Sequence, residues 1–272
     1  MAYCKVKQAE IYYEDIGEGK PIVMIHGFSP DHRLMKGCME PIFTERDGWR
    51  RIYIDLPGMG RTKNYQDINS SDDMLKAVCE FIQSVIPDED YIIVGESYGG
   101  YITRGIIKKD AERVQGAAFI CPVILPNPED RTVGAHHILK KDEAFLSKLS
   151  NEEAEDFSNH QVVLDEYNWS RYKDEVLSGC MVVDEKVLLK VKERYAFSFD
   201  VDQEDFLKPS LFLMGRQDSI VGYKDALDVM EKYPRGTFAT LDVAGHNLQI
   251  EQSDLFSHLV HEWLDRVEGE KN

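Results

Sequence analysis

The ten residues IIVGESYGGY, 92–101, place one serine among glycines directly after a run of β-branched residues. The apolar run is typical of a strand that is buried on both faces. We predict a helix from about residue 98 to 111, so the chain passes from strand to helix within GESYGG. In such a sharp turn the apex residue adopts a strained backbone, which lifts its side chain clear of the sheet.

Ser97 lies at the apex of this turn, and glycines lie two residues before and after it. Gly95 and Gly99 suit places where chain segments approach closely, and Gly100 gives the helix room to pack. The free N–H groups at a helix amino terminus also favour developing negative charge. A phosphate-binding turn or a plain tight turn is the alternative, since GxSxG is short enough to occur by chance. The strand before it and the helix after it favour Ser97 as a nucleophile.

Strand and helix patterns alternate on both sides of the turn. Apolar or alternating runs predict strands over residues 5–14, 21–26, 49–58, 91–95, 114–123, 210–215 and 237–243. Apolar residues at helical spacing predict helices over residues 72–86, 98–111, 223–233 and 253–266. This alternation is typical of an α/β fold with a mostly parallel sheet flanked by helices.

The alternation stops between residues 126 and 205, where the sequence is charged, aromatic and helical in pattern. We predict that residues 1–125 and 206–272 form the core and that 126–205 form a helical lid over the carboxyl edge of the sheet. A separate small helical domain without a role in the site is the alternative.

A nucleophilic serine needs a base, and the base needs a carboxylate that orients it. His246 follows the last predicted strand, at the sheet edge where open α/β sheets place their sites. Asp218 follows the predicted strand 210–215 at the same edge, although it could instead cap the next helix. The chain order serine, acid, histidine also favours Asp218 and His246.

Acyl transfer further requires N–H donors for an oxyanion. Phe28 follows the predicted strand 21–26, and Tyr98 follows the serine, so their backbone N–H groups are the candidates. His26, Asp55 and Arg61 are interpreted as residues that fix loops.

Four motifs resemble the α/β-hydrolase fold family in its order: HGF (26–28), DLPGMGR (55–61), GESYGG (95–100), and GRQD (215–218) with AGHN (244–247). The resemblance implies a lid-bearing, esterase-like serine hydrolase, with a helical lid inserted after the sixth strand of the sheet. It implies Ser97 as nucleophile, Asp218 as acid and His246 as base. Relatives that dehalogenate or open epoxides need an aspartate at the apex, so Ser97 argues against both activities.

The resulting hypothesis is hydrolysis of a small ester through an acyl-enzyme, with no metal or organic cofactor implied. Cleavage of a carbon–carbon bond, of an amide or peptide bond, and cofactor-free perhydrolysis use the same residues. A small-molecule receptor or pseudoenzyme is the alternative from another class. Tyr167, Trp169 and Phe197 could bind an apolar part of the substrate or form the core of the lid.

The chain of 272 residues carries 32 basic and 49 acidic residues, a net charge of −17. This balance disfavours nucleic acid and anionic membranes as partners and leaves a small-molecule substrate. The five cysteines are odd in number and form no CxxC pair, and the amino terminus has no signal-peptide pattern. We therefore expect a cytoplasmic protein with reduced thiols, and we make no prediction of its oligomeric state.

Overall fold

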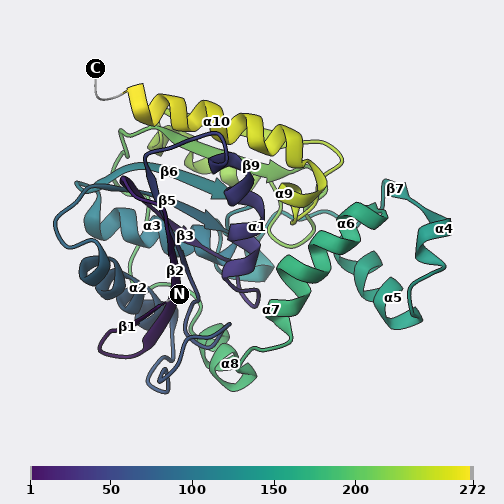
Figure 1. Cartoon of the computed structure of the whole chain (residues 1–272), viewed down its shortest axis with the longest axis horizontal. Helices are drawn as coiled ribbons and strands as arrows, with labels where there is room; N and C mark the ends of the chain where they lie inside the picture. Colours follow the sequence, from purple (N-terminus) through teal and green to yellow (C-terminus); the bar gives the residue numbers. More distant parts are fainter. Residues whose placement is uncertain (1, 270–272) are drawn as a thin grey trace.

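A central sheet with helices on both faces dominates the computed structural model, which describes residues 2–269 (Figure 1). The eight strands lie in the order β1-β2-β4-β3-β5-β6-β9-β10. They are β1 (Ala2–Lys5), β2 (Glu10–Ile16), β3 (Lys20–Ile25), β4 (Trp49–Ile54), β5 (Tyr91–Glu96), β6 (Val114–Ile120), β9 (Ser210–Gly215) and β10 (Gly236–Leu241). The β1/β2 and β2/β4 pairs are antiparallel, whereas the pairs from β4 to β10 are parallel. The predicted mostly parallel sheet is confirmed.

Helices pack on the sheet in two pairs. On one face α1 (His32–Phe43) contacts α10 (Ser253–Gly269), and on the other α2 (Ser71–Val85) contacts α3 (Tyr98–Asp110) (Figure 1). The Trp263 indole in α10 is fully buried and donates a hydrogen bond to the Pro209 carbonyl over 3.0 Å. Both faces of the sheet are therefore covered, which explains the continuous apolar runs of its central strands. Within residues 2–269, no helix is both long and apolar enough to cross a membrane.

Some elements of the core differ from the sequence predictions. The single strand predicted over 5–14 is wrong, because a turn closed by the Val6 N–H and the Ala9 carbonyl separates β1 from β2. The helix predicted over 223–233 is a 3₁₀ helix, η3 (Asp225–Lys232), whose start has no side-chain cap. Helix α1 was not predicted; the Asp31 carboxylate caps its amino terminus by accepting the Arg33 N–H.

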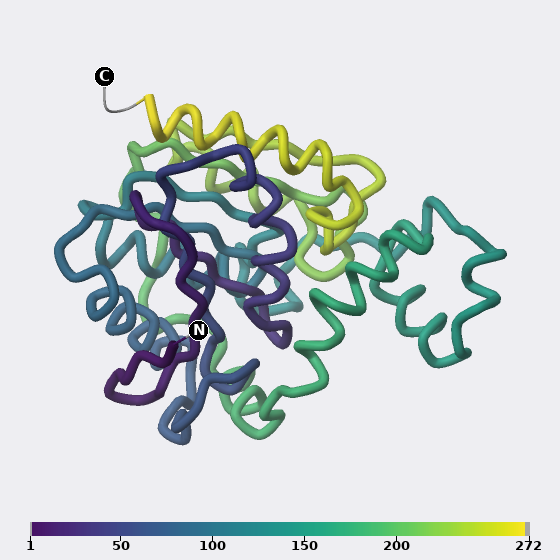
Figure 2. Tube along the Cα trace, viewed as in Figure 1, coloured from purple at the N-terminus to yellow at the C-terminus, as the bar shows by residue number. Residues whose placement is uncertain are grey.

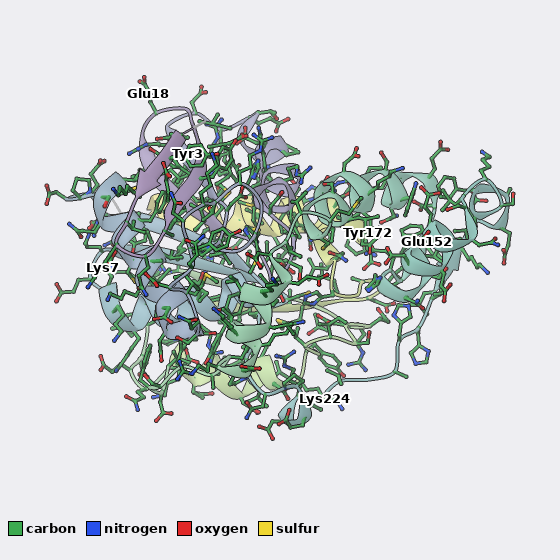
Figure 3. The ribbon with its side chains drawn as sticks, turned by 90° about the horizontal axis from the view of Figure 1, so that it is seen from below. Tyr3, Lys7, Glu18, Glu152, Tyr172 and Lys224 are labelled. Carbon is green, nitrogen blue, oxygen red and sulfur yellow. The ribbon has the colours of Figure 1, made fainter. Side chains whose placement is uncertain are left out.

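The segment 126–205, here called the cap segment, connects β6 to β9 and extends to one side of the sheet (Figure 2). Its elements are η1 (Pro128–Asp130), β7 (Lys140–Lys141), α4 (Glu143–Leu146), α5 (Asn151–His160), β8 (Val163–Leu164), α6 (Glu166–Arg171), the π-helical η2 (Tyr172–Leu177), α7 (Ser178–Cys180) and α8 (Glu185–Glu193). Tyr172 lies between the core and the outer part of the cap segment that carries Glu152 (Figure 3). Part of the cap segment has a small apolar cluster separate from the main core, made of Phe145, Leu146, Phe157, Leu164, Trp169 and Tyr172. Other apolar side chains of the segment, among them Val187, Leu188 and Val191, belong to the main core.

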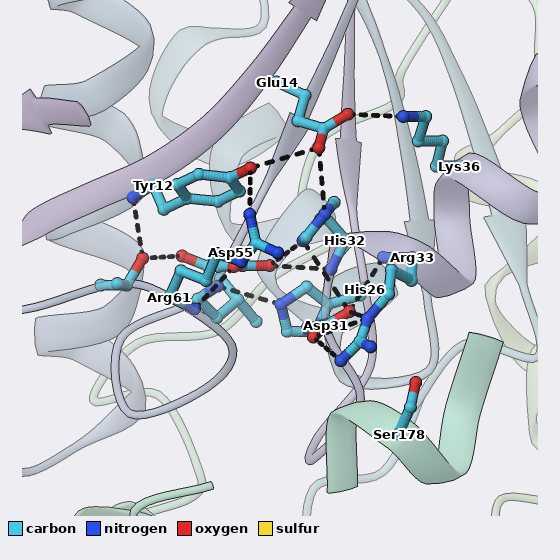
Figure 4. A network of polar contacts seen from close by, with 12 residues as sticks. Tyr12, Glu14, His26, Asp31, His32, Arg33, Lys36, Asp55, Arg61 and Ser178 are labelled. Carbon is cyan, nitrogen blue, oxygen red and sulfur yellow. Dashed lines mark hydrogen bonds and ion pairs between the residues drawn. The ribbon is translucent and has the colours of Figure 1, made fainter. Parts of the chain in front are cut away.

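A buried polar network fixes the loops that follow β3 and β4 (Figure 4). One Asp55 carboxylate oxygen accepts the His32 backbone N–H over 2.8 Å and lies 2.7 Å from the His32 Nδ1, and the other accepts the Arg61 N–H over 2.8 Å. The Leu56 N–H donates to the His26 Nε2 over 3.0 Å, so the neutral His26 ring donates from Nδ1 to the Gly27 carbonyl. The side chains of Asp55 and His26 therefore hold two loops at the carboxyl edge of the sheet.

We predict that Asp55→Ala lowers the free energy of unfolding by about 3 kcal/mol, because it leaves several buried donors without an acceptor. Chemical denaturation monitored by circular dichroism measures the change. The matched control is Asp67→Ala, because Asp67 is exposed and its carboxylate makes no hydrogen bond within residues 2–269. Equal losses of stability in the two variants would contradict the role of the network.

Candidate active site

The turn between β5 and α3 is strained at its apex. Ser97 has φ +50° and ψ −112°, a conformation that side-chain-bearing residues rarely adopt. Its N–H donates to the Ile120 carbonyl over 2.9 Å, and its carbonyl accepts the Val123 N–H over 3.0 Å. These backbone hydrogen bonds, to the last residue of β6 and to the segment that follows it, hold the strained residue in place. The Ser97 side chain is thereby presented at the carboxyl edge of the sheet.

Glycines allow the backbone segments around Ser97 to touch. A Cβ at Gly99 would lie 2.2 Å from the Ile25 carbonyl oxygen, and one at Gly95 would lie 2.3 Å from the Gly99 carbonyl oxygen. Real Cβ atoms do not approach backbone so closely, so only glycine fits at these two positions. A Cβ at Gly27 would lie 3.1 Å from the Ser97 Cβ, so the loop after β3 lies directly against the serine.

The structure brings the three side chains predicted for nucleophile, base and acid together. The Ser97 Oγ lies 2.9 Å from the His246 Nε2, and the His246 Nδ1 lies 2.8 Å from an Asp218 carboxylate oxygen. The other Asp218 oxygen accepts the backbone N–H groups of Ile220 and Val221 over 2.8 and 3.0 Å. In the neutral ring, Asp218 accepts from Nδ1–H, which leaves the Nε2 lone pair directed at the serine hydroxyl.

Charges and hydrogen bonds set the protonation states of Asp218 and His246. Burial acts to raise the pKa of Asp218, but His246 and the two backbone N–H groups more than offset it and hold the pKa below its usual range. Burial acts to lower the pKa of His246, but the Asp218 carboxylate and then Glu96 raise it to about 9. The carboxylate is thus ionised, and it stabilises the imidazolium that forms when the histidine accepts a proton.

Glu96, the residue before the apex serine, lies close to the His246 ring. It is buried, and its Oε1 lies 3.5 Å from the His246 Nε2, whereas its Oε2 has no hydrogen-bond partner within residues 2–269. Burial raises the pKa of Glu96 to about 7, against the opposing effect of His246. Its position next to the apex was the only signal in the sequence.

Glu251 is a second residue near the site that no sequence pattern indicated. Its side chain, on α9 (Leu248–Glu251), accepts the Gly245 N–H over 2.5 Å and the Val162 and Val163 N–H groups over 2.5 and 3.3 Å. Gly245 precedes His246, and Val162 and Val163 belong to the cap segment. One carboxylate therefore ties the histidine loop to the cap segment.

The two predicted oxyanion residues both lie beside the serine. Tyr98 is the first residue of α3, where a helix leaves its N–H without an intrahelical partner. Phe28 follows Gly27 in the loop against Ser97, and its ring packs edge-on to that of Tyr98 with centroids 5.1 Å apart. The use of their N–H groups as oxyanion donors stays a prediction.

Ser97 and His246 open into a cavity of about 650 Å³ between the sheet edge and the cap segment. Phe28 contributes to its wall from the core, and Tyr172 and Tyr195 contribute from the cap segment. Its volume falls within the range of sites for small organic molecules.

The aromatic residues predicted to bind substrate do not line this cavity. The Trp169 ring is buried against Phe157 in the cap cluster, and the Phe197 ring stacks on Tyr101 with centroids 4.2 Å apart. Tyr167 is exposed, and its hydroxyl donates to the Ser253 Oγ over 3.1 Å. The expected contacts are therefore unsupported, because residue type and spacing do not tell a cap core from a cavity wall.

Within residues 2–269, two groups bring together side chains of the types that bind metals: Cys121, Asp218 and His246, and Asp31, His32 and Asp55. In the first, burial raises the pKa of the Cys121 thiol well above its usual value, and a protonated thiol is a poor ligand. The Asp55 carboxylate of the second already accepts hydrogen bonds from His32 and Arg61. We assign neither group as a metal site.

Comparison with known proteins gives the same fold. The family model for the alpha/beta hydrolase fold matches residues 20–253. The solved structure of an alpha/beta superfamily hydrolase from Oenococcus oeni is 27% identical, with a TM-score of 0.90 over 98% of this chain and 100% of that one.

Two curated relatives also match nearly end to end. A 2-hydroxy-6-oxo-2,4-heptadienoate hydrolase from Pseudomonas putida is 23% identical over 94% of this chain and 92% of its own. A pimeloyl-[acyl-carrier protein] methyl ester esterase from Legionella pneumophila is 24% identical over 93% and 99%. Because the family model covers most of its length, the chain belongs to the alpha/beta hydrolase fold family.

Proposed function

We propose that the protein is a serine hydrolase that cleaves small esters, with Ser97 as nucleophile, His246 as base and Asp218 as the orienting acid. The proposal rests on two contacts of the His246 ring. Its Nε2 lies 2.9 Å from the Ser97 Oγ, and its Nδ1 lies 2.8 Å from an Asp218 carboxylate oxygen. Both distances lie within hydrogen-bond reach, which is the geometry that an activated serine needs.

The reaction then proceeds in two acyl transfers. The Ser97 Oγ attacks the ester carbonyl carbon while its proton passes to the His246 Nε2, and the N–H groups of Phe28 and Tyr98 bind the oxyanion. As the tetrahedral intermediate collapses, Nε2–H protonates the leaving alcohol and the acyl group stays on Oγ. Water attacks this ester in the same way, releasing the acid and restoring the serine hydroxyl.

The two curated relatives differ in the bond that their names describe. The Legionella relative is a methyl ester esterase, whereas the Pseudomonas relative is a hydrolase of 2-hydroxy-6-oxo-2,4-heptadienoate. Carbon–carbon bond hydrolysis is therefore the second candidate; amide or peptide cleavage and perhydrolysis would use the same three residues. Ester hydrolysis is placed first because the Legionella relative, whose name describes an esterase, matches over 99% of its own length.

A receptor or pseudoenzyme with the same fold is the alternative from another class, since a cavity of about 650 Å³ also suits ligand binding. A fluorophosphonate probe separates the two: rapid covalent labelling supports an enzyme, and ligand-stabilised melting without labelling supports a receptor. We further propose a small-molecule substrate and a cytoplasmic location, which the five free cysteines support.

We predict that Ser97→Ala lowers kcat for a 4-nitrophenyl ester by roughly three to six orders of magnitude, because the acyl-enzyme cannot form. Ester turnover and thermal unfolding are measured for the wild type and the variant. Ser84→Ala is the control, because Ser84 is exposed on α2, its hydroxyl donates to the Glu80 carbonyl, and it does not line the cavity. Wild-type turnover in a folded Ser97→Ala protein would refute the proposed nucleophile.

We predict that Glu96→Gln shifts the acidic limb of the kcat/KM profile to lower pH by about one unit. Only neutral His246 accepts the serine proton, so activity falls as the pH drops through the pKa of this residue, which is raised to about 9. Removing a negative charge 3.5 Å from Nε2 destabilises the imidazolium and lowers that pKa.

The profile is measured between pH 5 and 10 for the wild type, Glu96→Gln and the control Glu18→Gln. Glu18 is exposed and lies far from Tyr172 and the cap segment (Figure 3). A limb that stays in place in Glu96→Gln, or that moves equally in Glu18→Gln, would show that Glu96 does not act on the histidine.

A further inference from the structure

Two cationic side chains, Arg131 and Lys192, line the cavity that contains the serine. The Arg131 guanidinium donates to the backbone carbonyls of Leu125, Pro126 and Ile220 over 2.9, 2.8 and 3.3 Å. These bonds fix its position without neutralising its charge. Neither cation has a carboxylate partner within residues 2–269, although the chain carries 49 acidic residues against 32 basic ones.

Both cations flank one aromatic wall of the cavity. The Lys192 Nζ lies 5.6 Å from the centroid of the Phe28 ring, and the Arg131 Cζ lies 6.0 Å from that of Tyr195. The two rings pack edge to face, with centroids 5.7 Å apart. The wall begins at Phe28, whose N–H we propose as an oxyanion donor, so both positive charges lie along the side of the cavity that borders the reacting carbonyl.

The acidic groups of the cavity are not available to these cations. The Asp156 carboxylate accepts the Tyr172 hydroxyl over 2.8 Å and lies 3.3 Å from the His160 Nδ1. Glu96 is buried behind the serine, with a pKa raised to about 7 by burial. The cavity therefore offers two unpaired positive charges on one wall, together with one engaged and one partly neutral carboxyl group.

We propose that the substrate is an ester that carries a carboxylate, and that Arg131 and Lys192 bind this carboxylate along the Phe28–Tyr195 wall. The inference rests on the proposed hydrolase function and names its substrate class. A guanidinium and an ammonium beside an apolar wall give charge-assisted hydrogen bonds to a carboxylate while the chain between carboxylate and ester packs on the rings. A singly charged group fits better than a phosphate dianion, because Asp156 and the ionised fraction of Glu96 repel additional negative charge.

Two pairs of esters test the inference, each differing only in charge. The first pair is 4-nitrophenyl hydrogen adipate and 4-nitrophenyl adipamate, with the carboxylate or amide on the acyl side. The second is 4-(butanoyloxy)benzoate and 4-(butanoyloxy)benzamide, with the group on the alcohol side. The measured quantity is the ratio of kcat/KM for the anionic ester to that for the neutral ester, corrected for the rates without enzyme.

We expect this ratio to fall about tenfold in Lys192→Met and in Arg131→Met for at least one pair, chiefly through KM. Arg131→Lys should restore part of the loss, and added salt should lower the wild-type ratio more than that of the variants. Lys173→Met is the matched control: the Lys173 Nζ also lies over an aromatic ring, 5.5 Å from that of Trp169, but outside the cavity. Its ratio should equal that of the wild type.

A ratio that is the same in the wild type, Lys192→Met and Arg131→Met for both pairs would overturn the inference. Arg131→Met loses three hydrogen bonds to backbone carbonyls. If this variant does not fold, the Lys192→Met ratio and the salt dependence of the wild-type ratio still test the inference. Failure of the proposed function looks different: none of the four esters is turned over and fluorophosphonate does not label Ser97.

Discussion

The close packing of backbone at the β5–α3 turn is the constraint on which the site depends. Gly99 lies so near the Ile25 carbonyl that a Cβ would come within 2.2 Å of it, and this contact seats α3 directly on β3. With the helix in that place, the chain can leave β5 only through the strained conformation of Ser97 at φ +50°. The parallel sheet and the helices on its two faces hold this turn rigid. The strain is therefore local, and the rest of the fold sustains it.

Loops from the same sheet edge complete the arrangement, and each is fixed by its own hydrogen bonds. Asp55 and His26 hold the loops after β4 and β3, and Asp218 accepts two backbone N–H groups of its own loop. Glu251 joins the loop of His246 to the cap segment. The position of the cap segment and the position of the histidine are thus coupled through one carboxylate. The cavity and the three aligned side chains are consequences of the same set of loops.

The sequence predicted the parts of this structure that depend on local pattern. Continuous apolar runs identified the buried parallel strands, and the glycines around Ser97 identified the turn, because both signals arise from a few adjacent residues. It did not identify Glu96, Glu251 or the unpaired charges of Arg131 and Lys192, because burial and partners depend on segments far apart in the chain. For the same reason, the sequence left open whether Trp169 and Phe197 bind substrate or form the core of the lid; in the structure both pack against other rings.

The most direct test of the account is a crystal structure of the protein after reaction with a fluorophosphonate. Phosphorus should be bonded to the Ser97 Oγ, with one phosphoryl oxygen within hydrogen-bond distance of the backbone N–H groups of Phe28 and Tyr98. The His246 ring should remain bonded to Asp218 and directed at the substituted oxygen. Phosphorus bonded to another residue, or a phosphoryl oxygen turned away from both N–H groups, would contradict it.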